Sequence, residues 1–114
     1  MSPRSPSGAA ALRTRASVFA ALGDTTRLSV LGRLAGGEPQ SISRLTAGTR
    51  LTRQAVTKHL RVLEGAGVVR SVRVGRESRF TLDQKPIAEA RDYLDTVSRQ
   101  WDDALARLKA FVEG

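Results

Sequence analysis

The sequence predicts a mainly α-helical domain that carries one small β-hairpin. Leu, Val and Ala follow one another at spacings of three and four along most of the 114-residue chain, which is typical of amphipathic helices. Between Val68 and Leu82 the apolar residues largely alternate with Arg or Ser around a turn at Gly75-Arg76. That pattern indicates two paired strands. The chain is long enough for one domain with a modest core.

The composition favours a partner that carries negative charge. The chain has 19 Lys and Arg residues against 11 Asp and Glu residues, a formal net charge of +8. Nucleic acid or an anionic membrane would suit such a balance, and a basic protein with neither partner is the alternative. The absence of Cys excludes disulfides and thiolate metal sites. No segment resembles a signal peptide or reaches membrane-spanning length, so we expect a cytoplasmic protein with no membrane partner.

Capping and breaking residues divide the chain into a terminal arm and five helices. Residues 1–13 begin with Ser, Pro and Gly and include Arg4 and Arg13, which predicts a flexible basic arm ahead of a folded domain over residues 14–114. Asp24 and Thr52 are suitable N-caps. Pro86 suits the first turn of a last helix that Asp83 caps. The expected helices cover about residues 14–22, 24–35, 41–46, 52–65 and 86–112.

The fourth expected helix is the most informative segment. Its apolar residues fall on one face: Ala55, Val56, Leu60 and Leu63. Polar side chains project from the other face: Arg53, Gln54, Thr57, Lys58 and Arg61. A short helix, a turn and a second helix with a polar outer face make a helix-turn-helix, and a basic hairpin after it would form a wing. The predicted fold is therefore a winged helix-turn-helix, about five helices with a two-stranded wing.

This arrangement predicts binding of double-stranded DNA. We expect Gln54 to bond adenine, Thr57 to meet a thymine methyl or a phosphate, and Lys58 to reach a guanine or the backbone. Arg53 and Arg61 would contact phosphates. On the hairpin, which also carries Arg70, the candidates are Arg73, Arg76 and Arg79. The alternative is an ordinary solvated helix face, with Arg73 or Arg79 paired to Glu77 across the hairpin.

The last expected helix carries an apolar seam that one small domain would not cover. Its members are Ile87, Ala90, Leu94, Val97, Trp101, Leu105, Leu108 and Val112. A homodimer would bury this seam, and the expected interface residues are Val18, Phe19, Leu94, Val97, Trp101, Leu105 and Leu108. The alternative is a seam that packs wholly within one monomer.

Three segments in the same order resemble the ArsR/SmtB family of bacterial winged-helix transcription regulators. They are FAALGDTTRL at 19–28, LTRQAVTKHLRVL at 51–63, and AGVV at 66–69 with RVGR at 73–76. The resemblance covers residues 17–112 and implies DNA binding and dimerisation. The family's metal sensors place a Cys-Val-Cys sequence where this chain has Ser41-Ile42-Ser43. We therefore expect no metal site and no cofactor.

His59 and the acidic residues of the last helix leave alternatives open. His59 is the one histidine of the chain; it would either contact DNA or lie partly buried beside the third helix. Asp92 and Asp95, or Asp95 and Asp102, would hold a hard cation across a dimer in one interpretation. In the favoured one they are solvated, with helical pairs Asp95–Arg99 and Asp103–Arg107.

The sequence thus predicts a sequence-specific, double-stranded DNA-binding transcriptional regulator, a homodimeric repressor of an inverted-repeat operator. It would read DNA through the helix at 52–65 and the wing at 68–82. One alternative is a winged-helix module that binds proteins; another is a regulator that depends on a partner protein or a metal. An enzyme is not expected, since the chain has no Cys nucleophile, no phosphate-binding loop and no serine–histidine–carboxylate set. The effector and any partner protein are not indicated.

Overall fold

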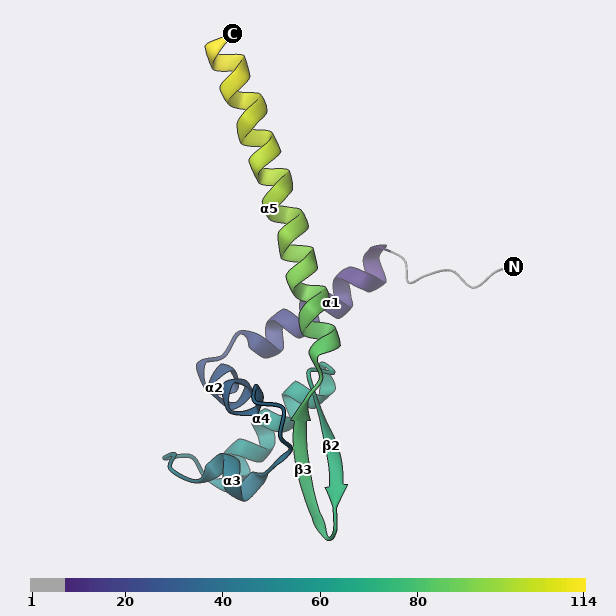
Figure 1. Ribbon diagram of the computed structural model, residues 1–114, viewed down its shortest axis with the longest axis vertical. Helices are drawn as coiled ribbons and strands as arrows, with labels where there is room; N and C mark the ends of the chain where they lie inside the picture. The colour runs from purple at the N-terminus through teal and green to yellow at the C-terminus, as the bar shows by residue number, and fades with distance from the viewer. Residues whose placement is uncertain (1–7) are drawn as a thin grey trace, which may run out of the picture.

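The computed structural model describes residues 8–114 as four helices and a small sheet, from which a fifth, long helix extends (Figure 1). In chain order the elements are α1 (Gly8–Leu22), α2 (Thr25–Leu34), β1 (Gln40–Ser41), α3 (Ile42–Thr46), α4 (Arg53–Gly65), β2 (Val69–Val74), β3 (Glu77–Leu82) and α5 (Gln84–Glu113). The winged helix-turn-helix prediction is confirmed in its order and in its helix count for the described residues. The molecule measures 66 × 45 × 21 Å along its principal axes, because α5 projects beyond the other helices and the sheet.

The core lies where α1, α2, α3 and α4 meet the hairpin. Side chains with no exposed surface come from α2, α4 and the start of the hairpin: Leu34, Val56, Leu60, Leu63 and Val68. Each buried aliphatic side chain of this size contributes about 1.5–3 kcal/mol relative to exposure. The core thus fixes α4 by its apolar face and leaves the opposite face free.

Three short polar side chains start the helices of this region. The carboxylate of Asp24 accepts a hydrogen bond from the Arg27 amide at 2.9 Å. The hydroxyl of Ser41 accepts one from the Arg44 amide at 3.1 Å. The hydroxyl of Thr52 accepts one from the Ala55 amide at 3.0 Å. These bonds satisfy amides that have no partner within the helix, so local chemistry sets where α2, α3 and α4 begin.

The sheet has one strand more than the sequence predicted. Strands β2 and β3 form the expected hairpin, with Val74 opposite Glu77 and a two-residue turn between them. Gly75 in that turn has φ +63°, a conformation that residues with side chains rarely adopt. In addition, Gln40 and Ser41 form β1, which pairs with β3 in the order β1-β3-β2. The two-stranded wing is confirmed, but the additional strand β1 was not predicted, because a two-residue strand has no periodicity to detect.

The predicted start of the first helix was also wrong. Helix α1 begins at Gly8, so residues 8–13 are helical and do not belong to a flexible arm. The run Ala9-Ala10-Ala11-Leu12 explains the difference, because Ala and Leu are the strongest helix formers. The rest of the expected arm, residues 1–7, lies outside the described residues.

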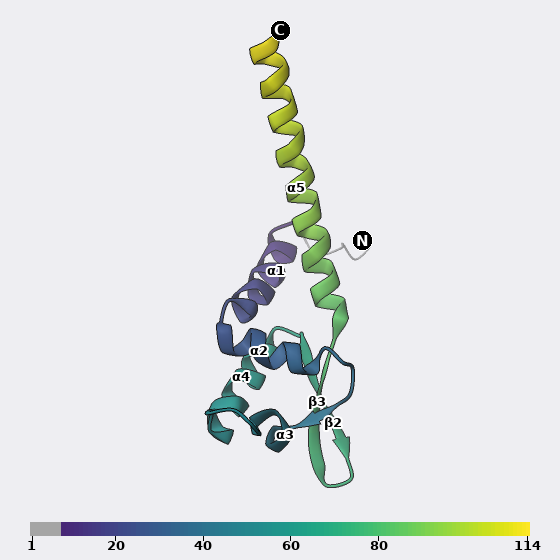
Figure 2. The ribbon, with the colours of Figure 1, turned by 60° about the vertical axis from the view of Figure 1, so that its left-hand side comes forward.

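Helix α5 begins where Asp83 accepts a hydrogen bond from the Lys85 amide at 3.1 Å. Its 30 residues span about 45 Å. Only its first part packs on the body, where Tyr93 lies 6.3 Å from the Phe19 ring and beneath the Arg15 guanidinium at 5.3 Å. Turning the molecule leaves the rest of α5 projecting away from the other elements (Figure 2).

The ion pairs expected along α5 were not found. Within the described part of the chain, α5 has one ion pair, between Arg91 and Asp92 at 3.7 Å. The predicted Asp95–Arg99 and Asp103–Arg107 pairs do not form. Both expected pairs are on exposed helix faces. Water competes for each charge there, so such a pair stabilises a helix by only about 0.3–0.5 kcal/mol.

Candidate DNA-binding surface

The exposed face of α4 carries five polar side chains, which we call the recognition face: Arg53, Gln54, Thr57, Lys58 and Arg61. Thr57 is half-buried and the other four are exposed. The opposite face, with Val56, Leu60 and Leu63, has no exposed surface. The polar residues that the sequence analysis assigned to DNA therefore lie together on the outer face of α4, and the buried face of the same helix packs in the core.

Two of these side chains also bond within the protein. The Thr57 hydroxyl donates to the Arg53 carbonyl at 2.7 Å, which leaves its oxygen lone pairs and methyl group for another partner. The Arg53 guanidinium donates to the Ser43 hydroxyl. This bond joins the start of α4 to α3, and it was not predictable from a local pattern because the two residues are ten positions apart.

A hollow separates the start of α4 from the tip of the wing, the β2–β3 hairpin. Its lining includes Arg53 from α4, Arg76 and Glu77 from the wing, and the serines Ser41, Ser43 and Ser78. The two guanidinium groups attract an anionic oxygen, and the opposing charge of Glu77 is partly offset by its pair with Arg79. It connects the recognition face and the wing into one cationic surface.

The arginines of the wing differ in their pairing. Arg79 donates from Nε to the Glu77 carboxylate at 2.7 Å, so its charge is partly offset. The predicted partners do pair, but both lie on β3, so the pair runs along one strand and not across the hairpin. Within residues 8–114, Arg70, Arg73 and Arg76 form no ion pair, and all three are exposed. They remain available to a polyanion.

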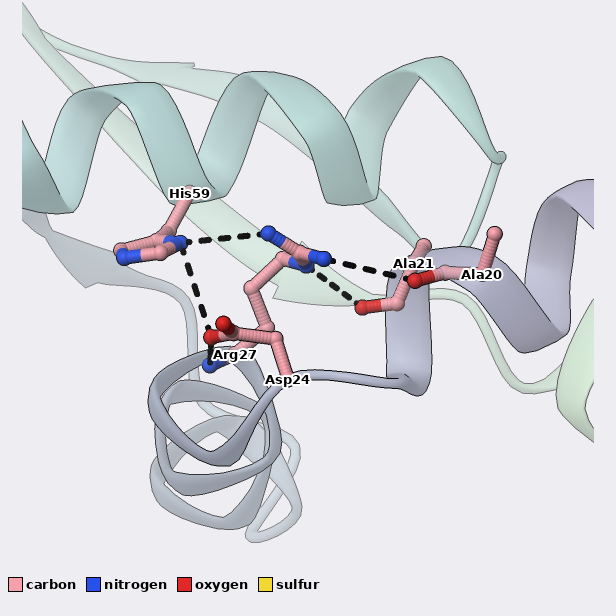
Figure 3. Close-up of polar contacts among 5 residues, drawn as sticks. All are labelled: Ala20, Ala21, Asp24, Arg27 and His59. Carbon is pink, nitrogen blue, oxygen red and sulfur yellow. Dashed lines mark hydrogen bonds and ion pairs between the residues drawn. The ribbon is translucent and has the colours of Figure 1, made fainter.

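His59 is partly buried, as one of the two sequence interpretations expected, but its neighbours differ from the expected ones. It is partly buried, with 24% of its side chain exposed, but against the start of α2 rather than beside α3. Its Nδ1 atom lies 3.5 Å from Arg27 Nη1 and 3.9 Å from a carboxylate oxygen of Asp24 (Figure 3). The expected neighbours were wrong because the residues that surround His59 come from a segment more than thirty positions away.

The apolar face of α5 is the second candidate surface. Five predicted interface residues lie on it and are 42–63% exposed: Leu94, Val97, Trp101, Leu105 and Leu108. Phe111 and Val112 extend the same exposure to the end of the helix. Val18, however, is 2% exposed and fills the protomer's own core, so it is not available to a partner. Phe19 is partly buried and packs on that core and on Tyr93.

The described residues form neither a metal-binding cluster nor a membrane-spanning helix. Between residues 8 and 114, no three His, Cys, Asp or Glu side chains lie close enough together to hold a metal ion. The same residues include no helix that is both long and apolar enough to span a bilayer.

The fold and the recognition face define a winged helix-turn-helix protein. A helix-turn-helix domain family matches residues 11–72, which is more than half of the chain. The chain belongs to this family and is a transcription regulator of the ArsR type, not an enzyme.

Individual relatives and solved structures are similar to this chain. The Bacillus subtilis helix-turn-helix-type transcriptional regulator YuzN is 37% identical over 76 residues, which cover 61% of this chain and 83% of the relative. The structure of an ArsR-like transcriptional regulator from Rhodococcus sp. RHA1 superposes with a TM-score of 0.79 at 38% identity and covers 89% of this chain and 94% of that one. A homodimeric winged helix-turn-helix DNA-binding domain from Mycobacterium bovis shares the fold, with a TM-score of 0.66 at 24% identity over 88% and 92% of the two chains.

Proposed function

We propose that the protein is a homodimeric repressor that binds an inverted-repeat operator in double-stranded DNA, in the cytoplasm. The observation that carries this proposal is the division of α4 into a fully buried apolar face and an exposed recognition face beside a cationic wing. A major groove admits one α-helix, and base edges there distinguish all four base pairs. The wing would lie on the neighbouring backbone or minor groove.

Each polar residue of the surface has a role under this proposal. Gln54 can bond adenine in bidentate fashion, while Thr57 and Lys58 reach neighbouring bases or phosphates. Arg53, Arg61 and Arg76 contact phosphates and set the register of the helix. Further phosphate contacts come from the wing: Arg70, Arg73 and, with its charge partly offset, Arg79.

The apolar face of α5 supports a twofold dimer. Contiguous apolar patches of this kind are uncommon on monomers and usually mark a protein contact. A second copy of α5 would cover residues such as Leu94 and Trp101 and place two recognition faces on successive turns of one side of the duplex. The homodimeric state of the Mycobacterium bovis domain with the same fold is consistent with this assembly. A dimer seated on a promoter represses by excluding polymerase.

Selection of bound genomic fragments by the purified protein at physiological salt tests the proposal. We expect an enriched inverted repeat whose half-sites are about one helical turn apart. Binding without an enriched sequence would contradict an operator-specific repressor. Binding that is insensitive to added salt would instead indicate a protein-binding module, because phosphate contacts weaken steeply as salt rises.

A matched pair of variants distinguishes recognition of bases from binding to phosphates. Gln54→Ala should lose about 1–3 kcal/mol of base discrimination at one operator position, because it removes a bidentate contact. Arg76→Ala should weaken specific and random duplexes alike and lower the salt slope by about 1. Equal losses on specific and random DNA for Gln54→Ala would remove this residue from base reading.

A further inference from the structure

Asp24, Arg27 and His59 form a polar junction, named here the α1–α2–α4 junction, at the back of the recognition helix. Arg27 Nε donates to the Ala21 carbonyl at 2.6 Å, and its Nη2 donates to the Ala20 carbonyl at 3.3 Å. One guanidinium thus closes the carboxyl end of α1, where carbonyls have no partner within the helix. The third nitrogen, Nη1, points to His59 on α4 (Figure 3). Arg27 therefore touches the first and the fourth helix at once.

The junction does not belong to the recognition face. At about 100° per residue, His59 lies roughly 140° around α4 from Gln54, on the side that packs against α1 and α2. Only 24% of its side chain is exposed. Any effect of His59 on DNA would therefore pass through the orientation of α4 and not through a contact with a base.

The protonation state of His59 decides which neighbour it can bond. Neutral imidazole with its proton on Nε2 offers Nδ1 as an acceptor to Arg27. A protonated ring has no acceptor, so two cations would then face each other 3.5 Å apart. The remaining partner is the Asp24 carboxylate at 3.9 Å, whose same oxygen already accepts the Arg27 amide that starts α2. On protonation, His59 therefore loses its hydrogen bond from Arg27 and is attracted instead to the Asp24 carboxylate, which caps α2.

The charged groups around the ring are few. From the segment that starts α2 they are Asp24 and Arg27, while α1 presents the Ala20 and Ala21 carbonyl oxygens. The hydrogen bond from the Arg27 amide is the main cause of the lowered pKa of Asp24. Desolvation raises this pKa, while the charges of Arg27 and of His59 lower it further. The carboxylate is consequently charged throughout the range in which a histidine changes state.

We infer that His59 and Arg27 are positioning residues for operator binding, which hold the recognition helix at a fixed angle to the helix pair α1 and α5 while His59 is neutral. This inference rests on the proposed function, because only a dimer that spans two half-sites requires that angle to be fixed. DNA affinity then falls when His59 takes up a proton, although the added charge by itself would attract phosphate.

The test is operator affinity against pH, measured by fluorescence anisotropy on a duplex of about 30 base pairs that carries the enriched repeat. The comparison is made between about pH 8 and pH 5.5, the range in which histidine is the ordinary side chain that changes charge, and His59 is the single histidine of the chain. We expect the dissociation constant of the unmodified protein to rise at least about fivefold on acidification, the lower range of coupling between sites.

Three variants give the result its meaning. His59→Asn keeps an acceptor near the position of Nδ1 but does not titrate, so it should bind like the unmodified protein at pH 8 and show no pH dependence. Arg27→Lys keeps the charge but cannot reach both α1 and His59, so it should bind weakly at every pH while light scattering finds an unchanged dimer. Arg33→Lys is the matched control on α2. Arg33 donates to the Leu45 and Ala47 carbonyls at the end of α3 and does not touch His59, so its pH profile should be that of the unmodified protein.

Several outcomes would overturn the inference. A flat profile for the unmodified protein would remove His59 from positioning, and affinity that rises on acidification would make it a phosphate contact. A slope that persists in His59→Asn would assign the transition to a group other than His59 and overturn the inference. Absence of any preferred sequence at any pH would contradict the proposed function itself, which distinguishes that failure from a failure of the junction.

Discussion

Helices α4 and α5 have the same kind of sequence but opposite fates in the fold. Each places apolar residues at spacings of three and four along one face and charged residues along the other. In α4 the apolar residues Val56, Leu60 and Leu63 have no exposed surface, whereas in α5 Leu94, Trp101 and Leu108 are more than half exposed. Amphipathic pattern therefore predicts that a face will be buried, but not whether the same chain buries it.

The difference arises from what surrounds each helix. Helix α4 packs against α1, α2, α3 and β2, while the neighbour of α5 is α1, along its first turns. Ala90, near that contact, is 4% exposed. Beyond Tyr93 the helix is stabilised by its own hydrogen bonds and, under the proposed function, by a second copy. Changes on the two faces should consequently respond differently to protein concentration.

The largest effect is expected in the core of α4. Leu60→Ala should lower the free energy of unfolding by about 3 kcal/mol, because it removes buried methyl groups and leaves a cavity. Urea unfolding would measure this loss, and it should be the same at low and high protein concentration. Leu28→Ala, at a leucine that is 53% exposed, is the control and should change stability far less. A loss equal to that of Leu60→Ala would contradict the burial described for the two leucines.

The next effect concerns the apolar face of α5. Trp101→Glu should raise the dimer dissociation constant roughly thirtyfold, about 2 kcal/mol, because it replaces a central aromatic anchor with a charge. Sedimentation or light scattering across a dilution series would detect the monomer. Arg99→Glu also adds negative charge to α5, but about 200° around the helix from Trp101, so it should leave the dimer intact. An unchanged dimer in Trp101→Glu would place this residue outside the interface.

A smaller effect is expected where α4 begins. Thr52→Ala should cost about 1 kcal/mol of stability, since the Ala55 amide loses the hydroxyl that caps it. Thr96→Ala, within α5, removes a hydroxyl that bonds the carbonyl four residues earlier at 3.1 Å and should cost less than about half as much. Thermal unfolding of both variants at one concentration gives the comparison. Equal losses would mean that the cap has no special role.

The smallest effect is confined to acid. The pKa of Asp24 in the folded protein lies below its ordinary value of 3.8, chiefly because the Arg27 amide bonds the carboxylate. The charged carboxylate therefore adds stability above that ordinary value, and this contribution disappears as the pH falls through the folded-state pKa. Asp24→Asn keeps a capping oxygen without the titration. Its stability should decline less than that of the unmodified protein between neutral pH and acid, and parallel declines would contradict a role for Asp24.

Local chemistry made much of the fold predictable from the sequence. Asp24 and Thr52 indicated helix starts because a short polar side chain can bond an amide only two or three residues ahead. The turn at Gly75 was predictable because a two-residue hairpin needs a positive φ. The polar residues of α4 were assigned to one face by periodicity alone, and the structure places all five there. Their assignment to DNA remains a prediction.

Contacts between distant segments were not predictable in the same way. Strand β1 depends on its pairing with β3, not on its own two residues. Val18 fits an exposed interface and a core equally well by spacing, and its position among the helices decides for the core. The partners of His59 come from the segment that opens α2, so no local pattern around residue 59 could reveal them. The start of α1 is different, since the alanine run was visible and was given too little weight.

The length of α5 left without a neighbour has a consequence for dose response. Under the proposed function, a dimer reads the operator and a single chain does not bury the face that holds it together. While most copies are single, the amount of dimer grows as the square of the total amount of protein. A modest change in the synthesis or degradation of the protein would then produce a disproportionate change in promoter occupancy. The apolar face of α5 therefore sets how sharply the regulated gene responds to the abundance of its regulator.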